Sequence, residues 1–108
     1  MPTIQIKVTV AANAVSANVV ADQLYRFIQR GRPVRVSCKA SATGIKSTVL
    51  NGIPVVQDQD ITFNATNQFP IIPDDVLTTF QAPGGELFIT HRNTTGAGID
   101  VVTKVEIA

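Results

Sequence analysis

The chain has 108 residues, of which 44% are hydrophobic and 16% charged, and its formal net charge is +1. This length suits one domain with a single core, and the hydrophobic content argues against disorder. The small net charge argues against a module that binds polyanions through bulk charge, and a single cysteine excludes an intrachain disulfide.

The chain opens with the alternation of a half-buried strand. Over residues 3–10, Ile4, Ile6, Val8 and Val10 fall on one face, and polar residues occupy the positions between them. A connector of small residues follows over 11–16.

The period then changes to that of a helix. One stripe of apolar residues recurs at helical spacing: Ala17, Val20, Ala21, Leu24, Phe27 and Ile28. Ser16 is suited to an N-cap, and Gly31 with Pro33 is suited to a stop. The pattern predicts one helix near residues 17–30.

The remaining chain alternates as short strands with turn residues between them. The predicted strands are 33–39, 45–50, 53–57, 61–65, 76–81, 87–91 and 99–107. Asn51-Gly52 is a strong hairpin signal, whereas Pro70 and Pro73 forbid a central strand around them. The sequence therefore predicts a single, mainly β domain over residues 1–108. We expect an antiparallel β-sandwich or barrel, jelly-roll-like, of seven to eight short strands with the one helix.

Residues for catalysis or metal binding are scarce. His91 is the only histidine, and we interpret it as a structural residue that ends an inward strand face. Catalysis by a cysteine–histidine pair would need Cys38 beside it, which no local pattern supports. The pairs Asp58/Asp60 and Asp74/Asp75 could offer oxygen ligands to calcium, but Asp58-Gln59-Asp60 lacks the following glycine and distal glutamate of a calcium loop, and Asp74-Asp75 after Pro73 is better suited to opening a turn. We predict that most phenylalanines are in the core, and that the protein is not an enzyme, with no cofactor, metal or catalytic residue.

Charge is segregated along the chain. The charged residues from 23 to 46 are all basic: Arg26, Arg30, Arg32, Arg35, Lys39 and Lys46. Those from 47 to 91, apart from His91, are all acidic: Asp58, Asp60, Asp74, Asp75 and Glu86. Three interpretations stay open: the two blocks pair within one subunit, they dock neighbouring subunits head to tail, or the basic block faces a phosphate backbone.

Self-association is also favoured by two other features. The charged fraction is below the roughly 25% of typical soluble domains, so subunit contacts could cover part of the surface. The last strand, 99–107, runs almost to the final residue with Val101, Thr103, Val105 and Ile107 on one face. If it is an edge strand, a neighbouring subunit is the obvious cover. The predicted interface residues are Arg26, Arg30, Arg32, Arg35, Asp58, Asp60, Asp74, Asp75 and Val102.

The C-terminal half resembles small virion proteins of bacterial viruses, such as coat, penton or decoration subunits with β-sandwich folds. The resemblance rests on NGIPVVQDQDI at 51–61, FPIIPDDV at 69–76 and APGGELFITHRNTTGAGIDVVTKVEI at 82–107. It implies a structural subunit that packs against a shell, with no catalytic residues. The predicted helix departs from these sandwiches, many of which have none.

We therefore predict a non-enzymatic capsid or capsid-decorating subunit that self-assembles and stabilises a viral shell. Its partners are expected to be itself, as a homo-oligomer, and other capsid subunits, with nucleic acid less favoured. No segment approaches the roughly 20 apolar residues of a membrane span, and the N-terminus lacks a signal-peptide pattern. The expected location is the virion, after synthesis in the host cytoplasm. The alternative is a small β-sandwich binding module for carbohydrate or a protein partner.

Overall fold

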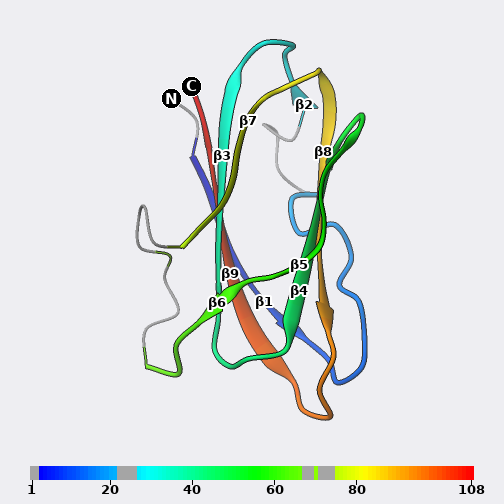
Figure 1. Ribbon diagram of the computed structural model, residues 1–108, viewed down its shortest axis with the longest axis vertical. Helices are drawn as coiled ribbons and strands as arrows, with labels where there is room; N and C mark the ends of the chain where they lie inside the picture. Colours follow the sequence, from blue (N-terminus) through cyan, green and yellow to red (C-terminus); the bar gives the residue numbers. More distant parts are fainter. Residues whose placement is uncertain (1–2, 22–26, 67–69, 71–74) are drawn as a thin grey trace.

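Two β-sheets face each other in the computed structural model, which describes residues 3–21, 27–66, 70 and 75–108 (Figure 1). The strands are β1 (Thr3–Val10), β2 (Phe27–Ile28), β3 (Pro33–Ala40), β4 (Ile45–Asn51), β5 (Pro54–Asp60), β6 (Thr62–Phe63), β7 (Val76–Gln81), β8 (Gly85–Asn93) and β9 (Ile99–Ile107). One sheet has the order β1-β9-β3, with β6 and β7 both on the far edge of β3, and the other has the order β2-β8-β4-β5.

The strands form nested antiparallel pairs. The outermost pair along the chain is β1 with β9, and inside it lie β2 with β8, β3 with β7, and β4 with β5. Only β6 interrupts this scheme among the described strands, because it pairs parallel with the end of β3 after the chain has crossed from one sheet to the other. The mainly β sandwich predicted from the sequence is confirmed, but the described residues form nine strands rather than seven to eight.

The core lies between the sheets and follows the alternation of the strands. Val34 and Val36 of β3, Val49 of β4, Ile89 of β8 and Val105 of β9 are each at most 1% exposed. Each buried side chain of this size contributes about 1.5–3 kcal/mol relative to an exposed one. The period-2 pattern therefore identified the inward faces correctly.

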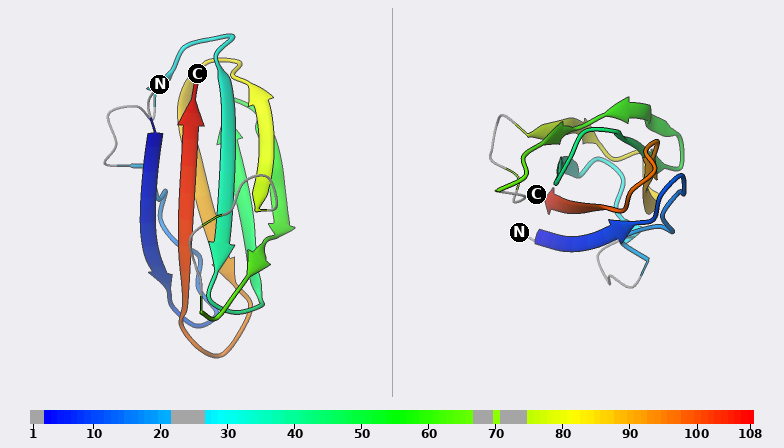
Figure 2. Two further views of the ribbon diagram at one scale, coloured as in Figure 1. Left: turned by 90° about the vertical axis from the view of Figure 1, so that its left-hand side faces the viewer. Right: turned by 90° about the horizontal axis from the view of Figure 1, so that it is seen from below.

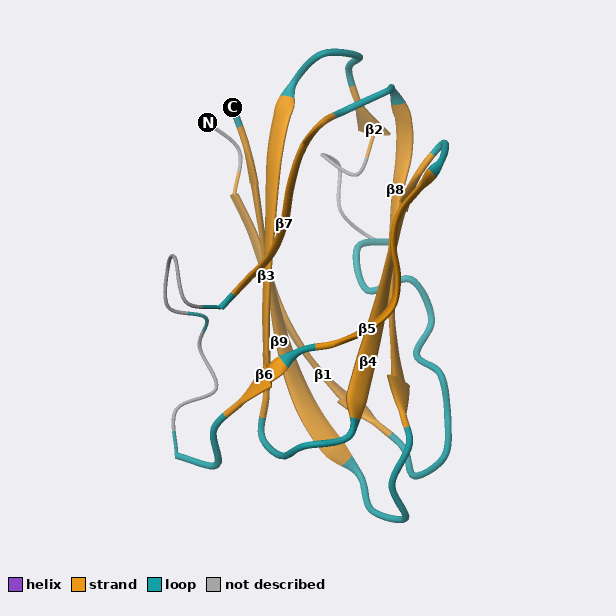
Figure 3. Cartoon of the chain, in the orientation of Figure 1, coloured by secondary structure: helices purple, strands orange, loops and turns teal. Residues whose placement is uncertain are grey.

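The predicted helix near residues 17–30 is wrong. Residues 17–21 form turns and irregular chain, and Phe27–Ile28 form β2, which pairs with the first residues of β8 (Figure 3). Residues 22–26, which include Leu24, lie outside the described part. Two members of the apolar stripe, Val20 and Ile28, are nevertheless buried in the core. The stripe thus marked residues that become buried, but not their secondary structure.

This segment is not helical because the open edge of β8 needs backbone hydrogen-bond partners. The N–H of Ser16 donates to the carbonyl of His91, and the N–H of Val19 donates to the carbonyl of Ile89. The side chain of Asn18 completes this edge: its Oδ1 accepts from the N–H groups of Val20 and Ile89, and its Nδ2 donates to the carbonyl of Leu87. A helix would satisfy its own backbone but leave the N–H and C=O groups of β8 without these partners.

The last strand is not an edge. β9 lies between β1 and β3 and pairs with both along most of its length (Figure 2). Val102 is 1% exposed, although the alternation puts it on the face opposite to Val101 and Val105. The condition under which a neighbouring subunit would cover β9, that it is an edge strand, is therefore not met, because both of its edges are covered within the subunit.

The role of Asn18 predicts that Asn18→Ala lowers the free energy of unfolding by about 1–3 kcal/mol, since two backbone donors and a backbone acceptor lose their partner. Urea unfolding would measure this change. Gln57→Ala is the matched control: Gln57 is exposed on β5, and its loss should change stability by less than about 0.5 kcal/mol. Equal effects of the two substitutions would contradict the role given to Asn18.

Candidate functional site

The structure joins the basic and acidic blocks within one subunit at two places. Lys39 Nζ lies 3.2 Å from Asp75 Oδ2, with both side chains less than 10% exposed, and Lys46 Nζ lies 3.5 Å from Asp60 Oδ1 at the surface. The Lys39–Asp75 pair is buried, so removal of either partner would leave an uncompensated charge. Two of the predicted interface carboxylates, Asp60 and Asp75, therefore have partners in their own chain.

In two further ion pairs, a residue of the basic or acidic block contacts a charged residue outside both blocks. Arg92 donates to both carboxylate oxygens of Asp58, at 3.0 and 2.6 Å, and Arg35 donates to both of Glu106, at 3.1 and 2.8 Å. The hydrogen bond from Arg92 lowers the pKa of Asp58, and the hydrogen bond from Arg35 lowers the pKa of Glu106. Bidentate geometry of this kind fixes both side chains.

The other predicted interface residues are dispersed. Arg32 is exposed and donates to the carbonyl of Ala108, and exposed Arg30 lies beside Gly84. Arg26 and Asp74 lie outside the described residues. The structure thus places most of the described charges of the two blocks in separate pairs, and it does not gather them into one surface.

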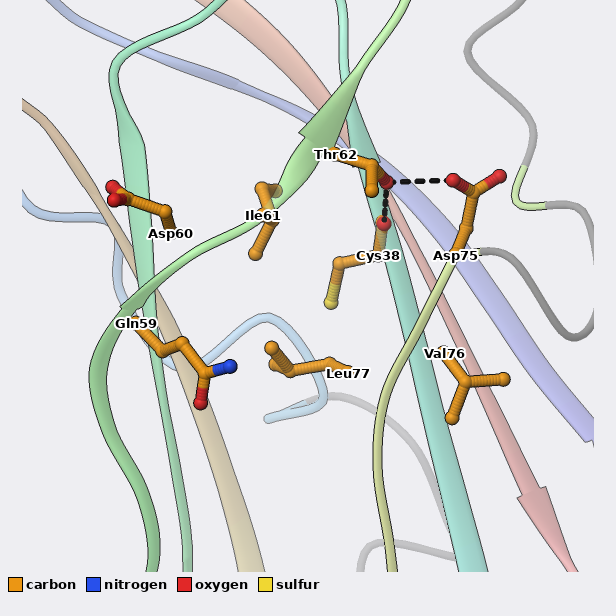
Figure 4. A pocket seen from close by; sticks show the side chains of 8 residues that line it. All are labelled: Cys38, Gln59, Asp60, Ile61, Thr62, Asp75, Val76 and Leu77. Carbon is orange, nitrogen blue, oxygen red and sulfur yellow. Dashed lines mark hydrogen bonds between the residues drawn. The ribbon is translucent and has the colours of Figure 1, made fainter.

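A cavity of about 190 Å³ opens where the chain crosses from β5 to β6 (Figure 4). Thr62 lies at its edge and donates to Asp75 Oδ1 at 2.7 Å, while Cys38 contributes its buried thiol. Burial raises the pKa of Cys38 to about 12, so this thiol is protonated at neutral pH and is a poor nucleophile. The cavity is therefore lined by an unreactive thiol and by the carboxylate of Asp75, which is held in a structural ion pair.

Three hydrogen-bonded polar side chains connect the two sheets across the core. His91 Nδ1 lies 2.6 Å from Ser47 Oγ, and His91 Nε2 lies 2.7 Å from Thr103 Oγ1. All three side chains are at most 1% exposed, so these hydrogen bonds are shielded from solvent. Burial lowers the pKa of His91 to about 4, which keeps the ring neutral at physiological pH. The interpretation of His91 as a structural residue on an inward face agrees with this position.

An apolar patch covers part of the outer face of the sheet β2-β8-β4-β5. We define it as Leu50, Ile53, Pro54 and Phe88; Leu50 lies directly opposite Phe88 on one side and Pro54 on the other. Leu50, Ile53 and Phe88 are 37%, 56% and 42% exposed, and the patch borders a hollow of about 470 Å³. Exposed apolar residues clustered in this way mark contact surfaces more often than singly exposed ones do.

The patch was missed in the sequence because the phenylalanines were expected in the core. Phe27, Phe63 and Phe88 are each more than 40% exposed, and Phe80 is partly buried, whereas Phe69 lies outside the described residues. The alternation of inward and outward residues along the strand did indicate the exposed position of Phe88. Phe88 stands between the inward residues Leu87 and Ile89, and strand alternation already places it outward.

Within the described ranges, no cluster of three or more His, Cys, Asp or Glu side chains is arranged to hold a metal ion. The same residues contain no helix with the length and hydropathy needed to cross a membrane.

The buried ring predicts a specific pH dependence of stability. Because the pKa of His91 is about 4 in the folded state and ordinarily 6.5, the unfolded chain gains the proton first as the pH falls. Stability should be complete above pH 6.5 and should fall by about 2 kcal/mol at pH 5 and about 3 kcal/mol near pH 4. Urea unfolding across this range would measure the loss. His91→Gln lacks the titrating ring, so the same fall in this variant would contradict the assignment.

Comparison with known proteins finds no matching family model, no similar curated protein and no similar solved structure. The resemblance of the C-terminal half to small virion proteins therefore stays a prediction.

Proposed function

We propose that the protein is a non-enzymatic virion subunit, of capsid or capsid-decorating type, that self-associates and stabilises a viral shell. The observation that carries this proposal is the strand order. With the two-residue β6 set aside, the nested pairs give the sheets β1-β9-β3-β7 and β2-β8-β4-β5. This is the order of a jelly roll, in which a long antiparallel hairpin is wrapped into two sheets. Viral capsid domains are among the proteins that use it.

The apolar patch supports self-association and supplies its surface. A subunit contact needs a core of apolar side chains that leave water, and Leu50, Ile53 and Phe88 are exposed together beside one hollow. The low charged fraction of the chain fits such a use of the surface. Neighbouring copies, or other subunits of the same shell, are the proposed partners, and the virion is the proposed location.

Docking of the basic block onto the acidic block of a neighbour has less support. Asp58, Asp60 and Asp75 each have a cation within their own subunit, so a neighbour would have to compete with Arg92, Lys46 and Lys39. A nucleic-acid role has less support for a related reason, since Arg35 is held by Glu106. The interpretation in which most charges pair within the subunit accounts for these contacts.

The second candidate is a binding module. Jelly rolls also occur in lectins, and exposed Phe88 beside the hollow of about 470 Å³ could stack on a sugar ring or receive a protein side chain. The two functions would use the same patch but differ in the state of the free protein, which would be monomeric in a binding module.

The patch predicts that Leu50→Thr with Phe88→Thr weakens self-association about tenfold or more, because apolar anchors at the centre of an interface carry most of its affinity. Threonine suits a strand and is polar, so the fold should be retained. Sedimentation and light scattering across a concentration series would measure the mass of each protein. Phe63→Thr is the matched control, since Phe63 is 56% exposed but lies on β6, in the other sheet.

Two further results bear on this proposal. An apolar contact should persist as salt rises, whereas docking through exposed charges would be screened within about 8–10 Å at 0.1–0.15 M. Electron microscopy of the assembled wild type should show closed shells or regular arrays. A wild type that is monomeric at every concentration would contradict self-association and leave the binding module.

A further inference from the structure

The sheets have four outer edges, and three of them carry features that discourage pairing with another chain. β5 begins at Pro54 and is distorted at Asp58, which has a φ of 49° and lies at a shift in the register with β4. β2 has only two residues, and β6 and β7 divide one edge into pieces of two and six residues. Short strands, prolines and bulges are the usual means by which an edge is protected.

β1 has none of these features, and its one charged residue, Lys7, is paired with Asp100 on the neighbouring strand β9. It keeps an unbroken register with β9 over all of its eight residues and contains no proline or glycine. In the described part of the chain no strand lies on its other side, so alternate N–H and C=O groups point outward (Figure 2). A regular edge of this length is a template for an added strand.

The inward side chains of β1 are also incompletely covered. Ile4 and Val10 are buried, but Ile6 and Val8 are only partly buried. They line a groove of about 450 Å³ together with Thr9 and residues 16–19. An added strand would therefore gain apolar contacts on one face as well as backbone hydrogen bonds.

We propose that the added strand is β1 of a second copy, paired antiparallel about a two-fold axis through Ile6. In this register Ile6 faces Ile6 of the second copy, Ile4 faces Val8, and Gln5 faces Lys7. Thr3 faces Thr9 at each end. Apolar residues meet apolar residues on the inner face, polar residues meet polar residues on the outer face, and no charge faces a like charge.

Other registers are worse. An axis through Lys7 places the ammonium groups of the two copies directly opposite each other, which is destabilising. An axis through Gln5 avoids this contact but pairs only residues 3–7. A shift by one residue turns the apolar face of one copy toward solvent. The register through Ile6 pairs the longest stretch, residues 3–9, without a like-charge contact.

This inference rests on the proposed self-association but uses a different surface, because the patch lies on the other sheet. A subunit with both contacts can join two kinds of neighbours.

The outer-face pair Gln5–Lys7 gives the test. Gln5→Lys places two like-charge contacts between the subunits of each dimer and should raise the dissociation constant about tenfold. The new ammonium group also faces Lys104 of its own subunit, but that contact is present in the monomer and in the dimer alike. Adding Lys7→Gln restores the original pairing in reversed order, so Gln5→Lys/Lys7→Gln should return to the wild-type constant with the wild-type composition. Thr3→Lys adds the same charge opposite Thr9 and should have little effect. Sedimentation in the Leu50→Thr/Phe88→Thr background measures this contact by itself.

A cross-link tests the register directly. Directly opposite residues in an antiparallel pair have Cα atoms about 4.5–5.5 Å apart, within the range of a disulfide, whereas Cα atoms more than about 7 Å apart cannot be bridged. A mixture of Gln5→Cys and Lys7→Cys proteins should form a disulfide-linked dimer under mild oxidation, and neither protein alone should do so. The native Cys38 is buried and will not compete.

Cross-linking in the mixture no greater than in the separate proteins, or a dissociation constant unchanged by Gln5→Lys, would overturn the β1 contact. In that case, loss of the larger assemblies on Leu50→Thr/Phe88→Thr would still support the proposed function. A specific cross-link with unchanged assembly of the patch variant would support the β1 contact and count against the patch.

Discussion

The fold depends on one constraint: the backbone N–H and C=O groups at the edge of a strand need partners. The edge of β8 illustrates its strength. Ser16 and Val19 donate backbone hydrogen bonds to carbonyls of β8, and the side chain of Asn18 takes the place of a backbone group where the strand geometry is not met. This requirement overrides a helical apolar stripe, because Val20 reaches the core from a turn and Ile28 reaches it from the short strand β2, without a helix.

The pairing of strands also determines which charged residues form ion pairs. The ion pairs that join distant parts of the chain lie beside strand pairs: Arg35 and Glu106 are register partners on β3 and β9, and Lys46 and Asp60 are partners on β4 and β5. Charges placed opposite each other across a pair reinforce the register. The buried pair Lys39–Asp75 links the end of β3 to the start of β7. Segregation of charge along the chain therefore becomes pairing between strands, and it does not produce two surfaces of opposite sign.

Strand positions could be predicted from the sequence, whereas strand neighbours could not. The alternation at 3–10, 33–39 and 99–107 sets which residues face inward, and the hairpin at Asn51-Gly52 sets one local pair. The central place of β9 depends on β1 and β3, which are distant in sequence, and no local pattern encodes that choice. The exposed position of Phe88 was predictable from its phase, since both of its neighbours are buried. The position was mispredicted because large aromatic residues were assumed to lie in the core.

The nested pairing also determines how subunits could meet. Because the chain alternates between the sheets, its first strand forms an outer edge of one sheet, while the hairpin of β4 and β5 forms an outer edge of the other. The unprotected edge of β1 and the apolar patch beside the β4–β5 turn consequently belong to different sheets. Contacts on different faces of one subunit have different axes, and repetition of two such contacts extends an assembly beyond a dimer. A closed shell requires more than one kind of contact on each subunit, whereas a sandwich with a single two-fold contact would stop at a pair.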